Sequence, residues 1–168
     1  KKKYKKRKYT YRFVLLPETI GSIAYLSKHK DILKKNVIAG YNLTCVGDER
    51  NFSLILSPRE NTISDISLQS ALIGKKNVNI YSYLHRGSDE RQYCSPLVDL
   101  PLCVFSRSKD YPEYHTDKDN FKVVTEKGLN GSLAIFKSII DGFENGFYPK
   151  TKIICEPNLG KRNLYPTV

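Results

Sequence analysis

Apolar residues recur along this chain in two alternating kinds of segment. Runs rich in β-branched and aromatic residues predict strands, and apolar residues three or four positions apart predict helices. The pattern predicts strands over residues 9–16, 37–46, 52–56, 78–84 and 100–105, and helices over residues 23–35, 61–73 and 125–145. The run at 37–46 is mostly apolar, which is typical of a buried central strand.

The alternation of strands and helices predicts an α/β fold with a mostly parallel central sheet. In such sheets, functional groups gather where the strands end. Polar residues follow four of the predicted strands: Glu18, Asp48 with Glu49, Asp89 with Glu90, and the turn that contains His115. We therefore expect Glu18, Asp48, Asp89 and His115 to lie along one edge of the sheet.

The composition predicts one folded domain. The chain has 168 residues, of which 40% are hydrophobic, and this is enough for a single core and too little for two. No apolar run approaches the roughly 20 residues of a membrane-spanning helix, and the start lacks the apolar segment of a signal peptide. The cysteines at 45, 94, 103 and 155 show no CxxC spacing, so we expect them to be reduced and unpaired in a cytoplasmic protein.

The net charge of +11 would raise nucleic acid as a partner, but the charge is uneven. Seven of the 28 basic residues lie among the first eight positions, which leaves 21 basic against 17 acidic residues in the rest of the chain. A basic leader is typical of a solvated tail, and no RNA-binding motif or DNA-reading helix accompanies it. Nucleic acid is not the expected partner of this segment, although a nucleic-acid-linked regulator stays open as an alternative.

Candidate chemistry is densest in residues 113–119, where His115 stands in a turn beside carboxylates. A neutral imidazole and nearby carboxylates are ligands that zinc accepts. The other interpretation is a polar surface turn with one incidental histidine.

Several motifs together resemble a known family. The runs at 12–22 (RFVLLPETIGS), 88–90 (SDE) and 115–119 (HTDKD) are similar in kind and order to those of the aminopeptidase-like zinc exopeptidases of peptidase clan MH. The runs at 17–22 (PETIGS), 86–96 (RGSDERQYCSP) and 155–162 (CEPNLGKR) resemble more closely a bacterial branch described as polysaccharide-biosynthesis proteins with an aminopeptidase-like domain.

The resemblance implies a three-layer α/β/α fold of the zinc-exopeptidase (phosphorylase/hydrolase-like) type. It implies that residues 1–147 form the C-terminal half of a catalytic domain, with the upstream half as a partner. Residues 148–168 would be a linker or tail toward a further domain. A homo-oligomer is left open.

The resemblance also implies roles for individual residues. His115 would be a zinc ligand, and Glu18 would replace the family's glutamate pair, as general base or as zinc ligand. The family's third carboxylate ligand has no acid at the aligned place in residues 43–47, so Asp48 is the substitute. In a full site, zinc would lower the pKa of a bound water and Glu18 would accept its proton.

The substrate would be a peptide or a small amide-bearing molecule. Arg86 and Arg91 have the geometry to hold a substrate carboxylate, with Asp89 beside them, and pairing of the arginines with Asp89 or Glu90 is the alternative. The sequence therefore predicts a zinc-dependent, peptidase-like hydrolase of the aminopeptidase type. A non-catalytic accessory or binding module of the same fold, in a polysaccharide-biosynthesis pathway, is the second hypothesis.

Overall fold

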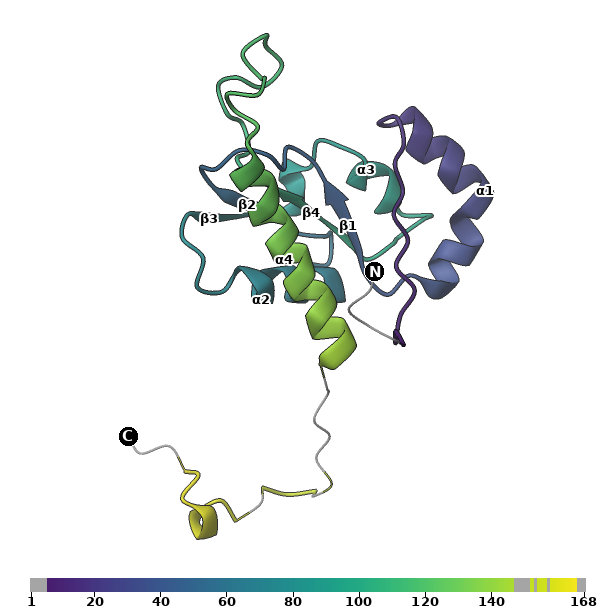
Figure 1. Ribbon diagram of the computed structural model, residues 1–168. Coiled ribbons are helices and arrows are strands. Elements are labelled where there is room, and N and C mark those ends of the chain that lie inside the picture. The colour runs from purple at the N-terminus through teal and green to yellow at the C-terminus, as the bar shows by residue number, and fades with distance from the viewer. Residues whose placement is uncertain (1–5, 147–151, 153, 157, 166–168) are drawn as a thin grey trace.

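The computed structural model describes residues 6–146, 152, 154–156 and 158–165. The elements follow one another in the order α1 (Ile20–Asn36), β1 (Gly40–Leu43), β2 (Phe52–Ile55), α2 (Ile63–Leu72), β3 (Val78–Tyr81), η1 (Tyr83–His85), α3 (Glu90–Tyr93), β4 (Leu102–Ser106), α4 (Glu126–Asn145) and η2 (Gly160–Arg162). Strand and helix alternate through most of the domain, which confirms the α/β class (Figure 1).

The sheet has four strands in the order β1-β4-β2-β3. Two of its three pairings, β1 with β4 and β2 with β3, are parallel, and the central pairing of β2 with β4 is antiparallel. The sheet is thus mostly parallel, as expected. The two parallel pairs run in opposite directions, however. The carboxyl ends of β1 and β4 therefore lie where the amino ends of β2 and β3 lie, and those of β2 and β3 lie at the opposite ends of the strands.

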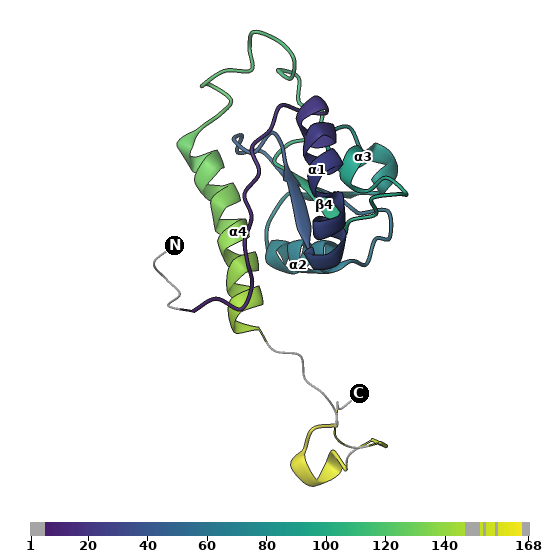
Figure 2. The same cartoon turned by 90° about the vertical axis from the view of Figure 1, so that its right-hand side faces the viewer.

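Helices cover both faces of the sheet, which gives three layers (Figure 2). On one face, α2 and α4 pack against alternate side chains of the central strands and form the main core. This core contains Leu54 of β2, Cys103 and Phe105 of β4, Leu68 and Leu72 of α2, and Ile135 and Ile139 of α4. On the other face lie α1 and α3, where Leu26 and Leu33 of α1 pack with Val98 and Leu100. The side chains of β4 alternate between these two layers, so all five of its residues are buried.

Local sequence signals fix the helices of the main core. The Thr62 side chain accepts from Asp65 N–H and the Asp65 carboxylate accepts from Thr62 N–H, a capping box that starts α2. The Thr125 side chain caps α4 by accepting from Gly128 N–H at 3.0 Å. Gly128 also allows close approach, because a Cβ there would lie 1.9 Å from the Gly47 carbonyl oxygen.

The strand expected at residues 9–16 is wrong. This segment is extended but pairs with no strand, and it crosses between α4 and α1 (Figures 1 and 2). The Glu144 carboxylate near the end of α4 accepts from Lys8 N–H at 2.9 Å and from the Tyr11 hydroxyl at 2.7 Å. The alternation of side chains suits a strand, but among the described residues no other strand forms a ladder with this segment.

The expectation of a buried central strand at residues 37–46 is also wrong. β1 lies at the edge of the sheet, and Leu43 is exposed. The helix predicted over residues 125–145 corresponds to α4, which buries Ile135 and Ile139 and leaves Leu129 and Leu133 exposed. None of the helices in the described ranges is long and apolar enough to cross a membrane.

Candidate functional site

A cavity of about 270 Å³ lies on the sheet face that carries α1 and α3. Its floor is formed by Ile55 of β2 and Val104 of β4, both buried. Its walls carry polar and aromatic groups from four loops: Glu18, Thr44, Cys45, His85, Gly87, Ser88, Glu90, Ser106, Ser108, Lys109, Asp110, Tyr111 and Tyr114. The cavity is the place where the expected motifs around Glu18 and Ser88 come together.

Two hydrogen bonds join these motifs across 70 residues of sequence. The Ser88 hydroxyl donates to Glu18 Oε1 at 2.5 Å, and the backbone N–H of Thr19 donates to Asp89 Oδ1 at 2.7 Å. Thr19 has a φ of 61°, a left-handed conformation that is uncommon for a β-branched residue. The contact with Asp89 therefore helps to hold a strained turn that points the Glu18 carboxylate toward the cavity.

Glu90 organises the loop from below. Its side chain is buried and accepts from Gly87 N–H at 2.7 Å, from Ser88 N–H at 3.0 Å and from the Asn42 side chain of β1 at 2.8 Å. Burying a carboxylate costs free energy unless the group is hydrogen-bonded, and here three donors bond to the Glu90 oxygens. From the sequence, Glu90 is considered only as a polar residue after a strand and as an ion-pair partner of the arginines. Its position directly after a short loop is the one sequence signal for its role as an acceptor of loop N–H groups.

Asp48 is held by hydrogen bonds from Ser108 and Arg50. Its carboxylate is buried and accepts from the Ser108 backbone at 2.8 Å, the Ser108 hydroxyl at 2.7 Å and Arg50 N–H at 2.9 Å. These bonds tie the loop after β1 to the loop after β4. The oxygens of Asp48 therefore support the fold at the position where a metal ligand was expected.

His115 stands in the long loop between β4 and α4, which extends away from the sheet in Figure 1. Its ring stacks on Tyr114 with the centroids 3.9 Å apart, and its φ is 60°. Nearby, Arg50 binds Glu113 through both terminal nitrogens at 2.9 and 2.8 Å, and this guanidinium holds the pKa of the Glu113 carboxyl below its usual value. The base of this loop lines the cavity through Tyr111 and Tyr114, but His115 is not among the lining residues.

The predicted substrate-binding residues are only partly together. Asp89 contacts Thr19, whereas Arg86 is exposed and lies over the ring of Tyr83, 4.9 Å from its centroid. Arg91 is also exposed. Among the ion pairs of the described residues, none joins either arginine to Asp89 or Glu90, so the alternative role as ion-pair partners is not seen.

The donors of this region do not form a metal site by themselves. No three histidine, cysteine, aspartate or glutamate side chains in the described ranges are placed to hold one ion. Of the four residues expected along one edge of the sheet, Glu18 and Asp89 belong to two motifs that hydrogen bonds join, whereas Asp48 bonds to Ser108 and His115 stacks on Tyr114. Ser108 and Tyr114 line the same cavity as Glu18, and the shared metal site of these four residues stays a prediction.

Comparison with known proteins connects this geometry to a family. Residues 1–146 match the sequence profile of a domain of unknown function, DUF4910. A Clostridium acetobutylicum protein, provisionally named as a polysaccharide biosynthesis protein with an aminopeptidase-like domain, is 36% identical over 163 residues. That alignment covers 95% of this chain and 37% of the relative.

Solved structures show the same fold. The crystal structure of a provisionally named peptidase from C. acetobutylicum superposes with a TM-score of 0.81 at 35% identity, covering 94% of this chain and 38% of that one. An aminopeptidase from Aneurinibacillus sp. strain AM-1 gives 0.61 at 17% identity, covering 83% and 33%. A zinc aminopeptidase from Bacillus subtilis gives 0.59 at 16% identity, covering 73% and 32%. The matched part of the chain thus spans between 32 and 38% of the length of these proteins.

Proposed function

The chain belongs to the DUF4910 family, and we propose that it supplies part of a peptidase-like hydrolase domain in which Glu18 is the general base. The aminopeptidase-like fold that the chain shares with its relatives supports this proposal. The observation that carries the proposal is the meeting of Glu18 with Ser88 and of Thr19 with Asp89 at one cavity. Those contacts join two separate motifs on which the resemblance to zinc exopeptidases depends.

The proposed chemistry is the hydrolysis of an amide bond in a peptide or small amide-bearing molecule. The Glu18 carboxylate would accept a proton from the attacking water and deliver it to the leaving nitrogen, so that no net proton is lost from the site. Ser88 orients this carboxylate by donating to one of its oxygens, which leaves Oε2 for the water. Arg86 and Arg91 remain proposed contacts to the substrate, with Asp89 beside them.

Zinc is the proposed cofactor, and its chemistry would be to polarise the substrate carbonyl and the attacking water. The carboxylate and imidazole donors have the right chemical character, and His115, Glu18 and Asp48 stay the candidate ligands. The described side chains do not place three such donors together. We therefore propose that a complete zinc site includes ligands from residues elsewhere in a longer protein.

The upstream half of the same domain is the proposed partner. Phe13, Leu15 and Ile20 are exposed to 77, 90 and 76%, and they lie in or next to the extended segment near the β1 edge of the sheet. Exposed apolar groups concentrated in this way are typical of a surface that packs against another part of a protein. The greater length of the relatives supports this proposal. The cytoplasm is the proposed location, supported by four unpaired cysteines.

A non-catalytic accessory module is the second candidate function. The observation in its favour is Asp48, whose carboxylate is fully engaged with Ser108 and Arg50 where the family would have a ligand. The provisional name of the clostridial relative suggests a polysaccharide-biosynthesis pathway for such a module.

Glu18→Gln in the intact gene product tests the catalytic proposal. Aminoacyl p-nitroanilide hydrolysis should lose about 10²–10⁴-fold in kcat with little change in KM, because the amide cannot accept the proton. Asp31→Gln, at an exposed position on α1, is the matched control and should keep full activity. Equal activity of Glu18→Gln and the control would remove Glu18 from the mechanism, and an inactive parent protein would favour the accessory module.

A further inference from the structure

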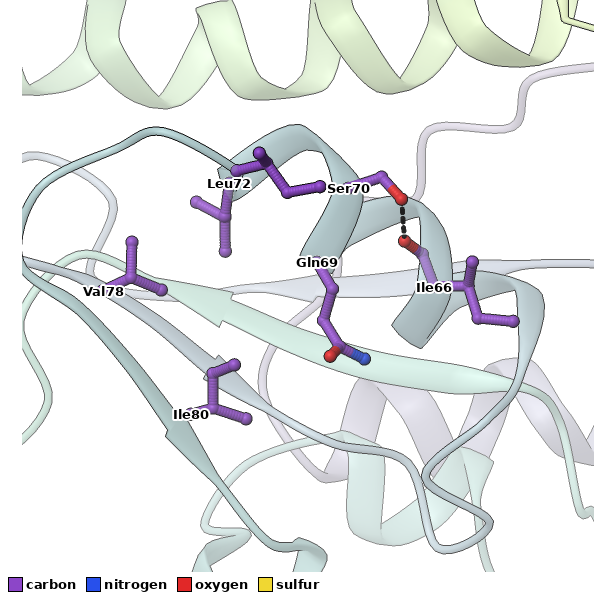
Figure 3. A pocket seen from close by; sticks show the side chains of 7 residues that line it. Ile66, Gln69, Ser70, Leu72, Val78 and Ile80 are labelled. Carbon is purple, nitrogen blue, oxygen red and sulfur yellow. Dashed lines mark hydrogen bonds between the residues drawn. The ribbon is translucent and has the colours of Figure 1, made fainter. Parts of the chain in front are cut away.

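An apolar groove lies on the other side of the sheet from the Glu18 cavity, between α2 and β3. Its volume is about 450 Å³. Figure 3 shows Val78 and Ile80 of β3 on one side of the groove and Ile66 of α2 on the other, with the Gln69 side chain extending from α2 between Ile80 and Ile66. Ile66, Ile73 and Ile80 are exposed to 56, 80 and 53%, so the groove is open to solvent.

The backbone beside the groove is an unpaired sheet edge. Among the described residues β3 pairs with β2 alone, and the carbonyls of Asn77 and Tyr81 accept from the backbone N–H groups of Phe52 and Leu56 at 2.9 Å. In a parallel ladder alternate residues turn their polar groups toward the same neighbour, so the N–H and C=O of Val78 and Ile80 face outward. The same two residues thus offer free backbone groups at the edge and apolar side chains in the groove, without the charge or proline that commonly protects an edge.

Two lysines stand at one end of this edge. Lys75 and Lys76 follow Gly74, which ends α2 with a φ of 75°, and both are exposed two or three residues before β3. No ion pair within the described ranges includes either lysine. The residues that line the groove are uncharged, so the two lysines beside the start of β3 give this end of the edge a positive charge.

We propose that this groove binds an extended segment of a partner protein, which adds a strand to β3 and carries acidic residues next to Lys75 and Lys76. Backbone hydrogen bonds to Val78 and Ile80 would supply affinity, and alternate apolar side chains of the partner would fill the groove. The Gln69 amide, which has no hydrogen-bond partner among the described residues, is placed to bond the added strand. Charge complementarity selects an acidic segment over a second copy of this basic chain.

Fluorescence anisotropy with defined peptides tests the proposal. The probe is a labelled peptide of Val-Thr repeats between Asp-Asp ends, and the comparison peptide has Lys-Lys ends. The acidic probe should bind about tenfold more tightly at low salt, with the difference shrinking as salt screens the charges. Equal binding of both peptides, or no binding of either, would overturn the proposal.

Variants of the chain locate the binding surface. Ile80→Lys should remove binding, whereas Ile32→Lys, at an equally exposed isoleucine of α1 (52% against 53%), should not. The double variant Lys75→Glu, Lys76→Glu should reverse the preference between the two peptides, and Lys28→Glu, Lys30→Glu on α1 should leave it unchanged. If Ile80→Lys fails to fold by circular dichroism, Ile73→Ser removes a more exposed part of the same groove.

Two further results would count against the proposal. Loss of binding in Ile32→Lys equal to that in Ile80→Lys would show that the peptide does not bind at β3. Concentration-dependent dimers in sedimentation velocity, abolished by Ile80→Lys and accompanied by no peptide binding, would assign the edge to a second copy of the chain. Neither result bears on Glu18, which lies on the opposite face of the sheet.

Discussion

Glu90 stabilises the candidate site from inside the protein. Its carboxylate is 1% exposed and receives hydrogen bonds from Gly87, Ser88 and Asn42. Removing one partner of a buried, charged hydrogen-bond network leaves the other groups unsatisfied, which costs more than the net value of the bonds. The position of Ser88 beside Glu18 therefore depends on a residue that does not itself contact Glu18.

We expect Glu90→Ala to lower the free energy of unfolding by about 3 kcal/mol. Glu90→Gln should lose less, because its amide oxygen still accepts from the loop. Urea unfolding followed by circular dichroism measures both, and Asp31→Ala on the exposed face of α1 should stay within about 0.5 kcal/mol of the parent. A Glu90→Ala protein as stable as the Asp31→Ala control would show that the buried carboxylate does not hold the loop.

The thiols differ by their surroundings, and all four are unpaired as expected. Burial raises the pKa of Cys94 from 9.0 to about 12 and that of Cys103 well above its ordinary value. Iodoacetamide at pH 8 should therefore modify exposed Cys155 first and leave Cys94 and Cys103 unmodified until the protein unfolds, as peptide mass spectrometry would show. Two disulfide-linked peptides, or fast labelling of Cys94 in the native protein, would contradict this.

The same pKa shifts set the alkaline behaviour. A thiol whose pKa is raised on folding favours the folded state while it is protonated in both states. This contribution is fully present below pH 9 and is lost as the pH rises from 9.0 toward 12. Cys94→Ala should accordingly flatten the fall in stability between these values, and an unchanged alkaline transition would show that Cys94 does not contribute to it.

At the scale of elements, the sequence was informative where the signal is local. The apolar spacing predicted α2 and α4 closely, and in the structure Thr62 and Thr125 cap these two helices. Residues 9–16 and β1 were misjudged because a side-chain pattern does not say which strand lies alongside. For the same reason the antiparallel pairing of β2 with β4 could not be read from the sequence, since it depends on distant partners. In the site, motif resemblance identified the segments around Glu18 and Asp89, but Glu90 and Ser88 became visible only through their contacts.

The junction between α4 and the loop after β1 offers a direct test of packing. Gly128→Ala would place a Cβ 1.9 Å from the Gly47 carbonyl oxygen and 2.7 Å from that of Asp48. Backbone must move to accept it, so we expect a loss of about 3 kcal/mol. Gly142→Ala, on the same helix with nothing within 4 Å, should instead gain about 0.5–1 kcal/mol through helix propensity.

Chemical denaturation of the two glycine variants measures the contrast. A similar change in both would show that the close approach of α4 to Gly47 is not what requires glycine at position 128. Because the same junction holds Asp48 against Ser108, the result also reports on a residue that the resemblance had assigned to the metal.

At the scale of the whole molecule, the chain is a layered α/β structure that leaves two apolar regions exposed. The core residues between α2, α4 and the sheet are buried, whereas residues 13–16 and the groove beside β3 expose apolar side chains to solvent. The relatives of this chain are more than twice as long. The proposed zinc site would therefore include ligands from residues outside this chain.

We expect the 168-residue chain to bind zinc weakly or not at all. Zinc sites in proteins use three or four side-chain ligands, and the described residues place no such group together. Isothermal titration calorimetry with chelator competition measures the affinity directly. Tight stoichiometric binding by this chain would show that its own residues complete the site and would overturn the proposal that ligands come from elsewhere.

In the intact gene product, two substitutions should separate ligand from base. His115→Ala should lower the zinc content and abolish peptidase activity, because loss of an imidazole weakens coordination itself. Glu18→Gln should lower activity far more than zinc content if Glu18 is the base, since the amide fills the same space but accepts no proton. Metal analysis by mass spectrometry beside activity measurements gives both quantities. Equal depletion of zinc by the two variants would make Glu18 a ligand, and full zinc content in His115→Ala would remove His115 from the site, in keeping with its present contact with Tyr114.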